Sequence, residues 1–157
     1  TGEIFPTNLV PVLLPSGSSA TPELLTWGFP NFRNKGVIIN ARAETAQEKR
    51  MFQRCVAEKR CVIPTTGFYE WDAKKTKFLF RLPQGPELYL AGLFNEFKGE
   101  RRFTILTTKA NSSISDLHHR MPLVLQKEDV NRWILDADHA IQLLHKIPPI
   151  LEKSLAS

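Results

Sequence analysis

Residues 77–107, KFLFRLPQGPELYLAGLFNEFKGERRFTILT, contain the pattern that decides the fold. Three stretches of this segment, 77–82, 87–94 and 102–107, alternate between apolar and polar residues or run apolar, and turns with glycine or proline separate them. Such stretches are typical of β-strands. The segment therefore predicts three successive strands with no helix between them.

Shorter apolar or β-branched runs predict further strands on both sides of this segment. They cover residues 9–14, 24–27, 37–40, 61–63, 68–71 and 123–125. Pro11 suggests that the first of these strands lies at the edge of a sheet, because proline cannot donate a backbone hydrogen bond. Residues 15–22, which include Ser, Gly and Thr, are expected to form a loop.

Apolar residues recur at helical spacing in three places. Residues 44–58 form the strongest helix prediction, because charged side chains fill the face that the apolar ones leave. Residues 127–135 and 138–145 predict two late helices. Strands do not alternate regularly with helices, so a doubly wound fold is not expected. We expect one domain over residues 1–157, of the α+β class, with a mainly antiparallel, β-barrel-like core and a few flanking helices.

The composition limits the kinds of protein that this chain represents. Of its 157 residues, 42% are hydrophobic and 24% are charged, which is typical of a globular domain. No apolar run approaches the roughly 20 residues that a membrane-spanning helix needs, so we expect no membrane partner. The formal net charge of +5 favours a polyanionic partner such as nucleic acid.

The two cysteines, Cys55 and Cys61, are too few for a disulfide framework, and their spacing matches no common zinc site. Arg54, Lys59 and Arg60 lie beside them, and nearby positive charge lowers the pKa of a thiol. The interpretation that we favour is that both are reduced thiols packed as small hydrophobic residues.

Glu70 lies in the pentapeptide Gly67–Trp71, GFYEW, where three aromatic residues flank it. Burying a carboxylate among apolar groups is costly and raises its pKa, which makes such a group useful as a general acid or base near neutral pH. In a strand the same residue can instead face solvent, because alternate side chains point to opposite faces.

A second polar cluster, NARAET at residues 40–45, stands between a predicted strand and a predicted helix. Asn40 offers an amide that can orient a substrate, and Arg42 offers a planar guanidinium suited to phosphate. The alternative is structural: Asn40 forms a turn, and Glu44 favours the start of the helix electrostatically.

The third cluster, LHHRMP at residues 117–122, follows a polar loop and precedes an apolar strand. Histidine is well placed to move a proton near neutral pH, and Arg120 can hold a phosphate or a carboxylate. A solvated loop histidine is the structural alternative. The adjacent histidines lack the spacing of zinc helices, and no acidic cluster suits magnesium, so we expect no metal.

Together the clusters supply an amide, a carboxylate, an imidazole and two guanidinium groups, a set that suits carbonyl or phosphodiester chemistry. The motifs NARAET at 40–45, RCVIP at 60–64 running into GFYEW at 67–71, and HHRMP at 118–122 resemble in order and spacing those of the SOS-response-associated peptidase (SRAP) family. The resemblance implies a compact α+β fold with a barrel-like core and a positively charged channel for single-stranded DNA. It also implies a covalent crosslink with abasic sites, in which an N-terminal cysteine closes a thiazolidine ring on the sugar aldehyde.

The resemblance also assigns roles to residues of this chain. Asn40 would orient the reacting end of the DNA, Glu70 would move protons at the cysteine amine, and His118 would assist sugar ring opening and Schiff-base formation. The residues expected to contact DNA are Arg42, Arg50, Arg120, Thr107 and Phe32. The family further implies no cofactor, a monomer that binds single-stranded DNA with abasic sites, and a bacterial cytoplasmic location, nucleoid-associated when DNA is bound.

The family begins Met-Cys-Gly-Arg, whereas this sequence begins Thr1-Gly2-Glu3 without that cysteine. We expect an upstream segment to carry it, because internal cysteines have no free α-amine and cannot form the ring. Two other functions stay open: a thiol autopeptidase or protease with Glu70 and His118 as acid and base, and a non-catalytic single-strand binding module.

Overall fold

Strand β10 (Glu100–Lys109) is the central strand of the fold, because it pairs with four other strands. The computed structural model describes residues 3–156, so Thr1 and Gly2 lie outside the described residues. Five strands close into a barrel in the order β10, β2, β1, β6, β9 and back to β10. The other four are β1 (Leu9–Ser16), β2 (Ser19–Trp27), β6 (Arg60–Thr65) and β9 (Leu88–Phe97). The predicted α+β class with a barrel-like core is confirmed.

The three strands predicted between residues 77 and 107 all form, as β8 (Lys77–Arg81), β9 and β10. β9 and β10 are joined by a two-residue turn at Lys98 and Gly99, whose φ angles of 51° and 81° suit a tight hairpin. The opposite edge of β10 departs from the antiparallel pattern, because there it runs parallel to β2 and to β5 (Asn40–Arg42).

The loop predicted at residues 15–22 is wrong, because most of this segment belongs to the hairpin of β1 and β2. Only Gly17 and Ser18 form the turn, and Gly17 has a φ of 61°, which glycine adopts without a Cβ clash. The edge position predicted from Pro11 is also wrong, since β1 is a wall strand of the barrel with a neighbour on each side, β2 and β6. However, β1 is bridged to β6 at one position alone among the described residues, and such a seam tolerates a residue without an N–H donor.

The helix predicted over residues 44–58 forms only as α1 (Gln53–Glu58). Residues 43–52 instead make successive turns, several of them closed by hydrogen bonds that span three residues rather than four. Ala43 and Ala46 are both buried, and their three-residue spacing matches these turns. Core packing of the two alanines therefore overrides the helical periodicity of the segment.

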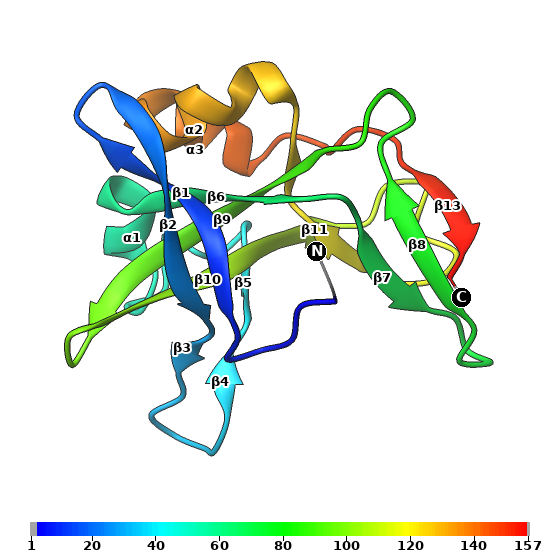
Figure 1. Cartoon of the computed structure of the whole chain (residues 1–157), viewed down its shortest axis with the longest axis horizontal. Coiled ribbons are helices and arrows are strands. Elements are labelled where there is room, and N and C mark those ends of the chain that lie inside the picture. Colours follow the sequence, from blue (N-terminus) through cyan, green and yellow to red (C-terminus); the bar gives the residue numbers. More distant parts are fainter. Residues whose placement is uncertain (1–2, 157) are drawn as a thin grey trace.

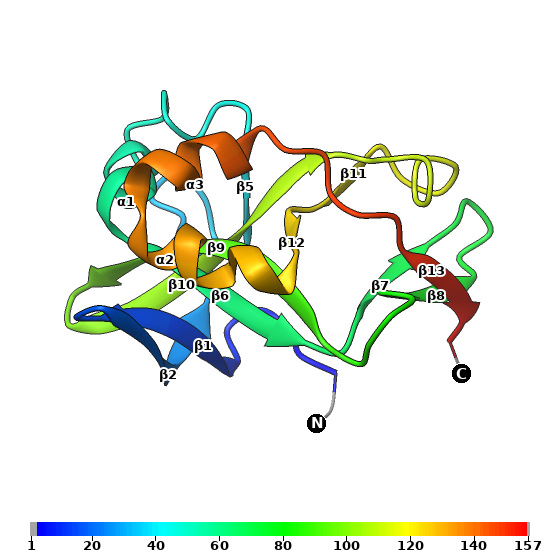
Figure 2. The same ribbon diagram turned by 90° about the horizontal axis from the view of Figure 1, so that it is seen from above.

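The two late helices form where they were predicted, as α2 (Val130–Leu135) and α3 (Ala137–Leu144). The remaining barrel-side elements are short: β3 (Phe29–Pro30), β4 (Val37–Ile38), β11 (Arg120–Pro122), β12 (Val124–Leu125) and a 3-10 turn at Lys127–Asp129. The three α-helices gather at one end of the molecule (Figures 1 and 2). At the other end lies a separate sheet of β7 (Phe68–Trp71), β8 and β13 (Glu152–Leu155). Among residues 3–156, no helix has the length and apolar character needed to span a membrane.

The buried side chain of Arg60, on β6, is hydrogen-bonded to two helices. Its guanidinium donates to backbone carbonyl groups at the ends of α1 and α2, over distances of 2.5–3.2 Å. These carbonyls belong to Val56, Ala57, Trp133 and Ile134. The last carbonyls of a helix lack intrahelical partners and carry partial negative charge, so they are suitable acceptors for a buried cation. Burial lowers the pKa of Arg60 from its ordinary value, and these hydrogen bonds offset that cost.

We expect Arg60→Met to lower the free energy of unfolding by about 3 kcal/mol or more, because four carbonyl groups, three of them in buried hydrogen bonds, lose their donor. Arg54→Met is the matched control, since the Arg54 side chain on α1 is 81% exposed. The control should change stability by less than about 0.5 kcal/mol. Urea unfolding followed by tryptophan fluorescence measures both variants. Equal losses in the two variants would contradict the role given to Arg60.

Candidate functional site

β5 and β11 flank the same half of β10 on opposite edges, and this brings two of the three polar clusters together. Asn40 lies opposite Ile105, and Arg42 lies opposite Thr107, which is also paired with β11. Asn40 and Arg42 are exposed while Ala41 between them is buried, as strand alternation requires. The first and third clusters therefore meet across β10.

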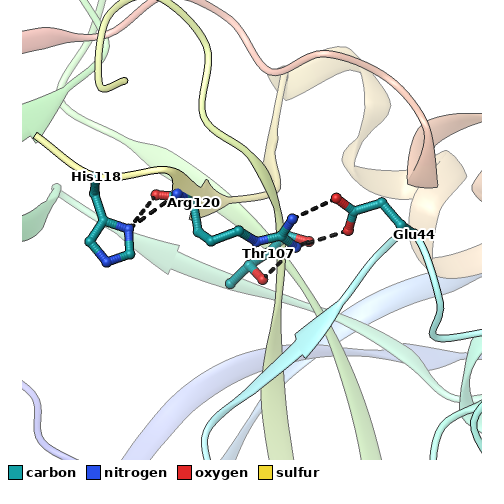
Figure 3. Close-up of polar contacts among 4 residues, drawn as sticks. All are labelled: Glu44, Thr107, His118 and Arg120. Atoms are coloured by element: carbon teal, nitrogen blue, oxygen red, sulfur yellow. Dashed lines mark hydrogen bonds and ion pairs between the residues drawn. The ribbon is translucent and has the colours of Figure 1, made fainter. Parts of the chain in front are cut away.

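The Arg120 side chain ties these strands to the turn after β5 (Figure 3). Its guanidinium forms a two-pronged ion pair with the Glu44 carboxylate, with N···O distances of 2.6 and 2.8 Å. One terminal nitrogen also donates to the backbone carbonyl and the hydroxyl of Thr107, at 3.0 and 3.1 Å. The hydrogen bonds from Arg120, helped by its charge and that of Arg42, lower the pKa of Glu44 from 4.5 to about 2.

His118 is held at one ring nitrogen by the backbone of Arg120. The Arg120 N–H donates to Nδ1 of His118 over 3.1 Å, and the Arg120 carbonyl oxygen lies 3.1 Å from the same nitrogen (Figure 3). The ring of His119 stacks on that of His118, with centroids 5.0 Å apart. Nε2 of the half-buried His118 has no hydrogen-bond partner within residues 3–156, so it is the nitrogen that can act on a substrate.

A cleft of about 420 Å³ is lined by side chains of both the barrel and the small sheet. Its walls include Ile39, Ile105, Tyr69 and Trp71. The first two lie beside and opposite Asn40, and the last two flank Glu70 on β7. Glu70 is half-buried. None of Asn40, Glu70 and His118 lines the cleft itself, and in the described part of the chain no hydrogen bond or ion pair joins any two of them. The structure therefore brings the first and third clusters together but does not join Glu70 to them by a direct contact.

Two predicted DNA-contact residues lie outside this group. Arg50 is exposed in the turns that precede α1. Phe32 lies between β3 and β4 and is 75% exposed, with its ring centroid 6.4 Å from that of Phe97. Both therefore remain at the surface, and neither forms part of the Glu44–Arg120–Thr107 network.

Both cysteines are free and buried. Burial raises the pKa of both thiols, and at Cys55 it outweighs the opposing charge of Lys59. The prediction that they are reduced thiols packed as small hydrophobic residues is confirmed, and their burial and raised pKa do not suit an activated nucleophile. Among residues 3–156, no group of three or more His, Cys, Asp or Glu side chains is arranged to hold a metal ion.

Glu44 is a member of the site that the sequence motifs do not single out, because an acidic residue at this position is equally expected at the start of a helix. The available signal was the alternation in NARAE. Asn40, Arg42 and Glu44 are all exposed, and the alanines between them are buried. The strand-like alternation thus continues one step past β5 and places Glu44 within reach of Arg120.

The lowered pKa of Glu44 predicts how its contribution to stability varies with pH. A carboxyl group with a lower pKa in the folded than in the unfolded chain stabilises the fold above its unfolded value, and this contribution disappears as the pH falls toward the folded value. We expect Glu44→Gln to lower the free energy of unfolding near neutral pH by at most about 1 kcal/mol, because the pair is partly exposed. The difference from the unmodified protein should vanish between pH 4.5 and about 2.

Urea titrations at a series of pH values measure this difference. Glu96→Gln, at an exposed position of β9, is the control and should show no such trend. A difference between Glu44→Gln and the unmodified protein that grows on acidification would contradict the assignment.

Comparisons with known proteins identify the family. The sequence profile described as "SOS response associated peptidase (SRAP)" matches residues 2–156. The chain is 33% identical over 159 residues to abasic site processing protein YoqW of Bacillus subtilis (strain 168), an alignment that covers 90% of this chain and 71% of that protein. It is 32% identical over 117 residues to abasic site processing protein YedK of Escherichia coli (strain K12), covering 69% of this chain and 52% of that protein.

Two crystal structures have the same fold. A protein from Bordetella bronchiseptica superimposes with a TM-score of 0.84 at 22% identity, covering 98% of this chain and 86% of that chain. A protein from Bacteroides thetaiotaomicron superimposes with a TM-score of 0.80 at 25% identity, covering 96% and 75%. The resemblance inferred from the three motifs is thus confirmed over nearly the whole sequence, and the chain belongs to the SOS response associated peptidase (SRAP) family.

Proposed function

We propose that this chain processes abasic sites in single-stranded DNA and takes part in a covalent DNA–protein crosslink with them. The observation that supports this most is that β5, with Asn40 and Arg42, and β11, with Arg120, are both paired with the same half of β10. Ile39 and Ile105, beside and opposite Asn40, line a cleft that Tyr69 and Trp71, the neighbours of Glu70, also line. The names of the relatives, which are abasic site processing proteins, support the same class of substrate.

The chemistry proposed is the capture of an aldehyde by an N-terminal cysteine supplied by a segment upstream of Thr1. The neutral α-amine adds to the aldehyde carbon of the ring-opened deoxyribose and gives a carbinolamine. Loss of its hydroxyl group as water gives a Schiff base, and addition of the thiol to the imine carbon closes a thiazolidine. One water is released in total, and each step requires a group that gives or takes a proton near neutral pH.

His118 and Glu70 are the proposed proton carriers. Nε2 of His118 would donate to the ring oxygen of the closed sugar, which opens to the aldehyde, and would then assist loss of water from the carbinolamine. Glu70, between the cleft-lining Tyr69 and Trp71, would accept a proton from the cysteine ammonium so that the amine becomes nucleophilic. Asn40 would orient the sugar, because its side-chain amide is exposed and has no hydrogen-bond partner within residues 3–156.

Arg42 is the proposed anchor for the DNA backbone at this site. It is exposed and forms no ion pair with another described residue, so its guanidinium is available to a phosphate. Arg120 and Thr107 were expected to contact DNA as well, but they are hydrogen-bonded to each other, so a phosphate would have to share Arg120 with Glu44. Farther from the site, Arg50 would hold a second phosphate and Phe32 would stack on a base.

The family description names a peptidase, and this favours autoproteolysis as the second candidate. Buried Cys55 and Cys61 cannot act as its nucleophile, so an autopeptidase would need the same upstream cysteine. Glu70 and His118 would again be the acid and base. The two activities differ in the substrate, which is a peptide bond in one case and a sugar aldehyde in the other.

We expect the protein with a cysteine exposed at its N-terminus to form an adduct with an abasic single-stranded oligonucleotide that survives denaturation. Glu70→Gln and His118→Gln should each slow adduct formation by about 10²-fold or more, because each removes a proton carrier. Gel electrophoresis after denaturation measures the rate. Cys55→Ser is the control and should leave the rate unchanged. An adduct with intact DNA, or the absence of an adduct with abasic DNA, would contradict the proposal.

We also expect Arg42→Ala to weaken binding to intact single-stranded DNA and to reduce the slope of log K against log salt by about 0.7, the value for one lost phosphate contact. Arg101→Ala is the matched control, because Arg101 lies on the other half of β10 and pairs with Glu23 at 3.0 Å. Fluorescence anisotropy over a range of salt concentrations measures both variants. Equal changes in slope would show that only net charge matters.

The third candidate function, a binding module without catalysis, would keep this salt dependence and form no adduct with abasic DNA.

A further inference from the structure

The guanidinium of Arg120 makes its hydrogen bonds inside the protein rather than toward solvent. Both terminal nitrogens donate to Glu44 or Thr107, its side chain is only 14% exposed, and Nε is buried without a partner in the described part of the chain. An arginine that binds phosphate through a two-pronged contact needs two free N–H groups on one side. Here that side is already occupied by the Glu44 carboxylate (Figure 3).

We propose that Glu44 is a positioning residue for His118, acting through Arg120. This inference rests on the proposed function in one respect, namely that His118 moves protons. The carboxylate holds Arg120 against β10, and the backbone of Arg120 in turn holds Nδ1 of His118. The chain of contacts runs from Glu44 through the guanidinium to strand β11, and from the first residue of that strand to the imidazole.

The backbone of Arg120 can hydrogen-bond His118 in each of its protonation states. When the neutral ring carries its proton on Nε2, Nδ1 accepts from the Arg120 N–H at 3.1 Å. When Nδ1 is protonated, in the cation or in the other neutral tautomer, it donates to the Arg120 carbonyl at the same distance. The ring can therefore exchange a proton at Nε2 without losing its partner at Nδ1. Such a pair of contacts suits a group that serves first as acid and then as base.

This arrangement requires the start of β11 to stay in place, and Glu44 supplies an anchor there. β11 has only three residues and follows the loop that carries His118. The turn that carries Glu44 is itself bound to β10, since the Ala43 N–H donates to the Thr107 carbonyl over 2.8 Å. Arg120 donates to the same carbonyl. The ion pair thus connects two chain segments that are both attached to Thr107, and it removes the freedom of Arg120 to move away from β10.

The test compares Glu44→Gln with Glu48→Gln in the full chain. Glu48 is exposed in the same run of turns, so its replacement removes the same charge without touching Arg120. The first measurement, which needs no DNA, is ¹⁵N NMR of the His118 ring nitrogens near neutral pH. We expect Glu48→Gln to leave the shifts of both ring nitrogens as they are in the unmodified protein. In Glu44→Gln the shift of Nδ1 should change, because the ring loses part of its contact with the backbone of Arg120. Arg120→Lys, which cannot form the two-pronged contact, should behave like Glu44→Gln.

The second measurement is the rate of adduct formation with abasic single-stranded DNA at saturating DNA concentration, using protein with an exposed N-terminal cysteine. Glu44→Gln should lower this rate about tenfold with little change in the half-saturating DNA concentration, and Glu44→Asp should restore part of it. His118 nitrogens that are unchanged in Glu44→Gln would overturn the inference. So would binding of intact DNA that is tighter in Glu44→Gln than in Glu48→Gln, because it would mean that Arg120 is a phosphate ligand that Glu44 restrains. If the nitrogens shift but the unmodified protein forms no adduct, the positioning role stands and the proposed function fails.

Discussion

A β-strand has only two hydrogen-bonding edges, and β10 divides each of them between two partners. Its first half pairs with β9 on one edge and with β2 on the other, and these pairings close the barrel. Its second half pairs with β11 and β5, which carry the polar clusters. The same ten residues therefore hold the barrel and assemble the site. A shift of β10 by one residue would turn Thr107 away from Arg120 and place the apolar side chains beside it on the wrong face.

Two glycines show how closely the chain must approach itself for this arrangement. A Cβ at Gly92 would lie 2.9 Å from the carbonyl oxygen of Thr104, so β9 could not sit this close to β10 with any other residue. A Cβ at Gly67 would lie 2.7 Å from the carbonyl oxygen of Phe80, at the point where the chain enters β7. The first glycine serves barrel closure. The second lets the Glu70 strand pack on β8, where Phe68 stacks on Phe80 with centroids 5.5 Å apart. The glycine of the GFYEW motif is thus explained by packing rather than by chemistry.

The strands of residues 77–107 could be predicted because local alternation and turn residues agree with the final structure. The helix over 44–58 could not, because its apolar spacing also satisfies a chain of turns that buries Ala43 and Ala46 against the core. The site shows the same limit. Residue types in the three motifs identify Asn40 and His118 as candidates, but nothing local reveals that Glu44 and Arg120, 76 positions apart, form an ion pair. That contact depends on the registers of β5 and β11 on β10, which are long-range properties of the sheet.

The arginines of this chain illustrate why charge alone is a poor guide to a DNA site. Arg60 is buried and hydrogen-bonded to helix carbonyls, and Arg120 is paired with a carboxylate, so neither offers its charge to a partner in the described structure. Arg42 lies one strand away from Arg120, opposite the same threonine, yet it is exposed and without an ion pair among residues 3–156. A cation in contact with a carboxylate attracts a further anion less than an exposed cation without an ion pair, so Arg42 attracts an anion more strongly than Arg120 does. The two guanidinium groups predicted from the motifs therefore differ in their surroundings: that of Arg120 is bound to Glu44 and Thr107, and that of Arg42 is exposed.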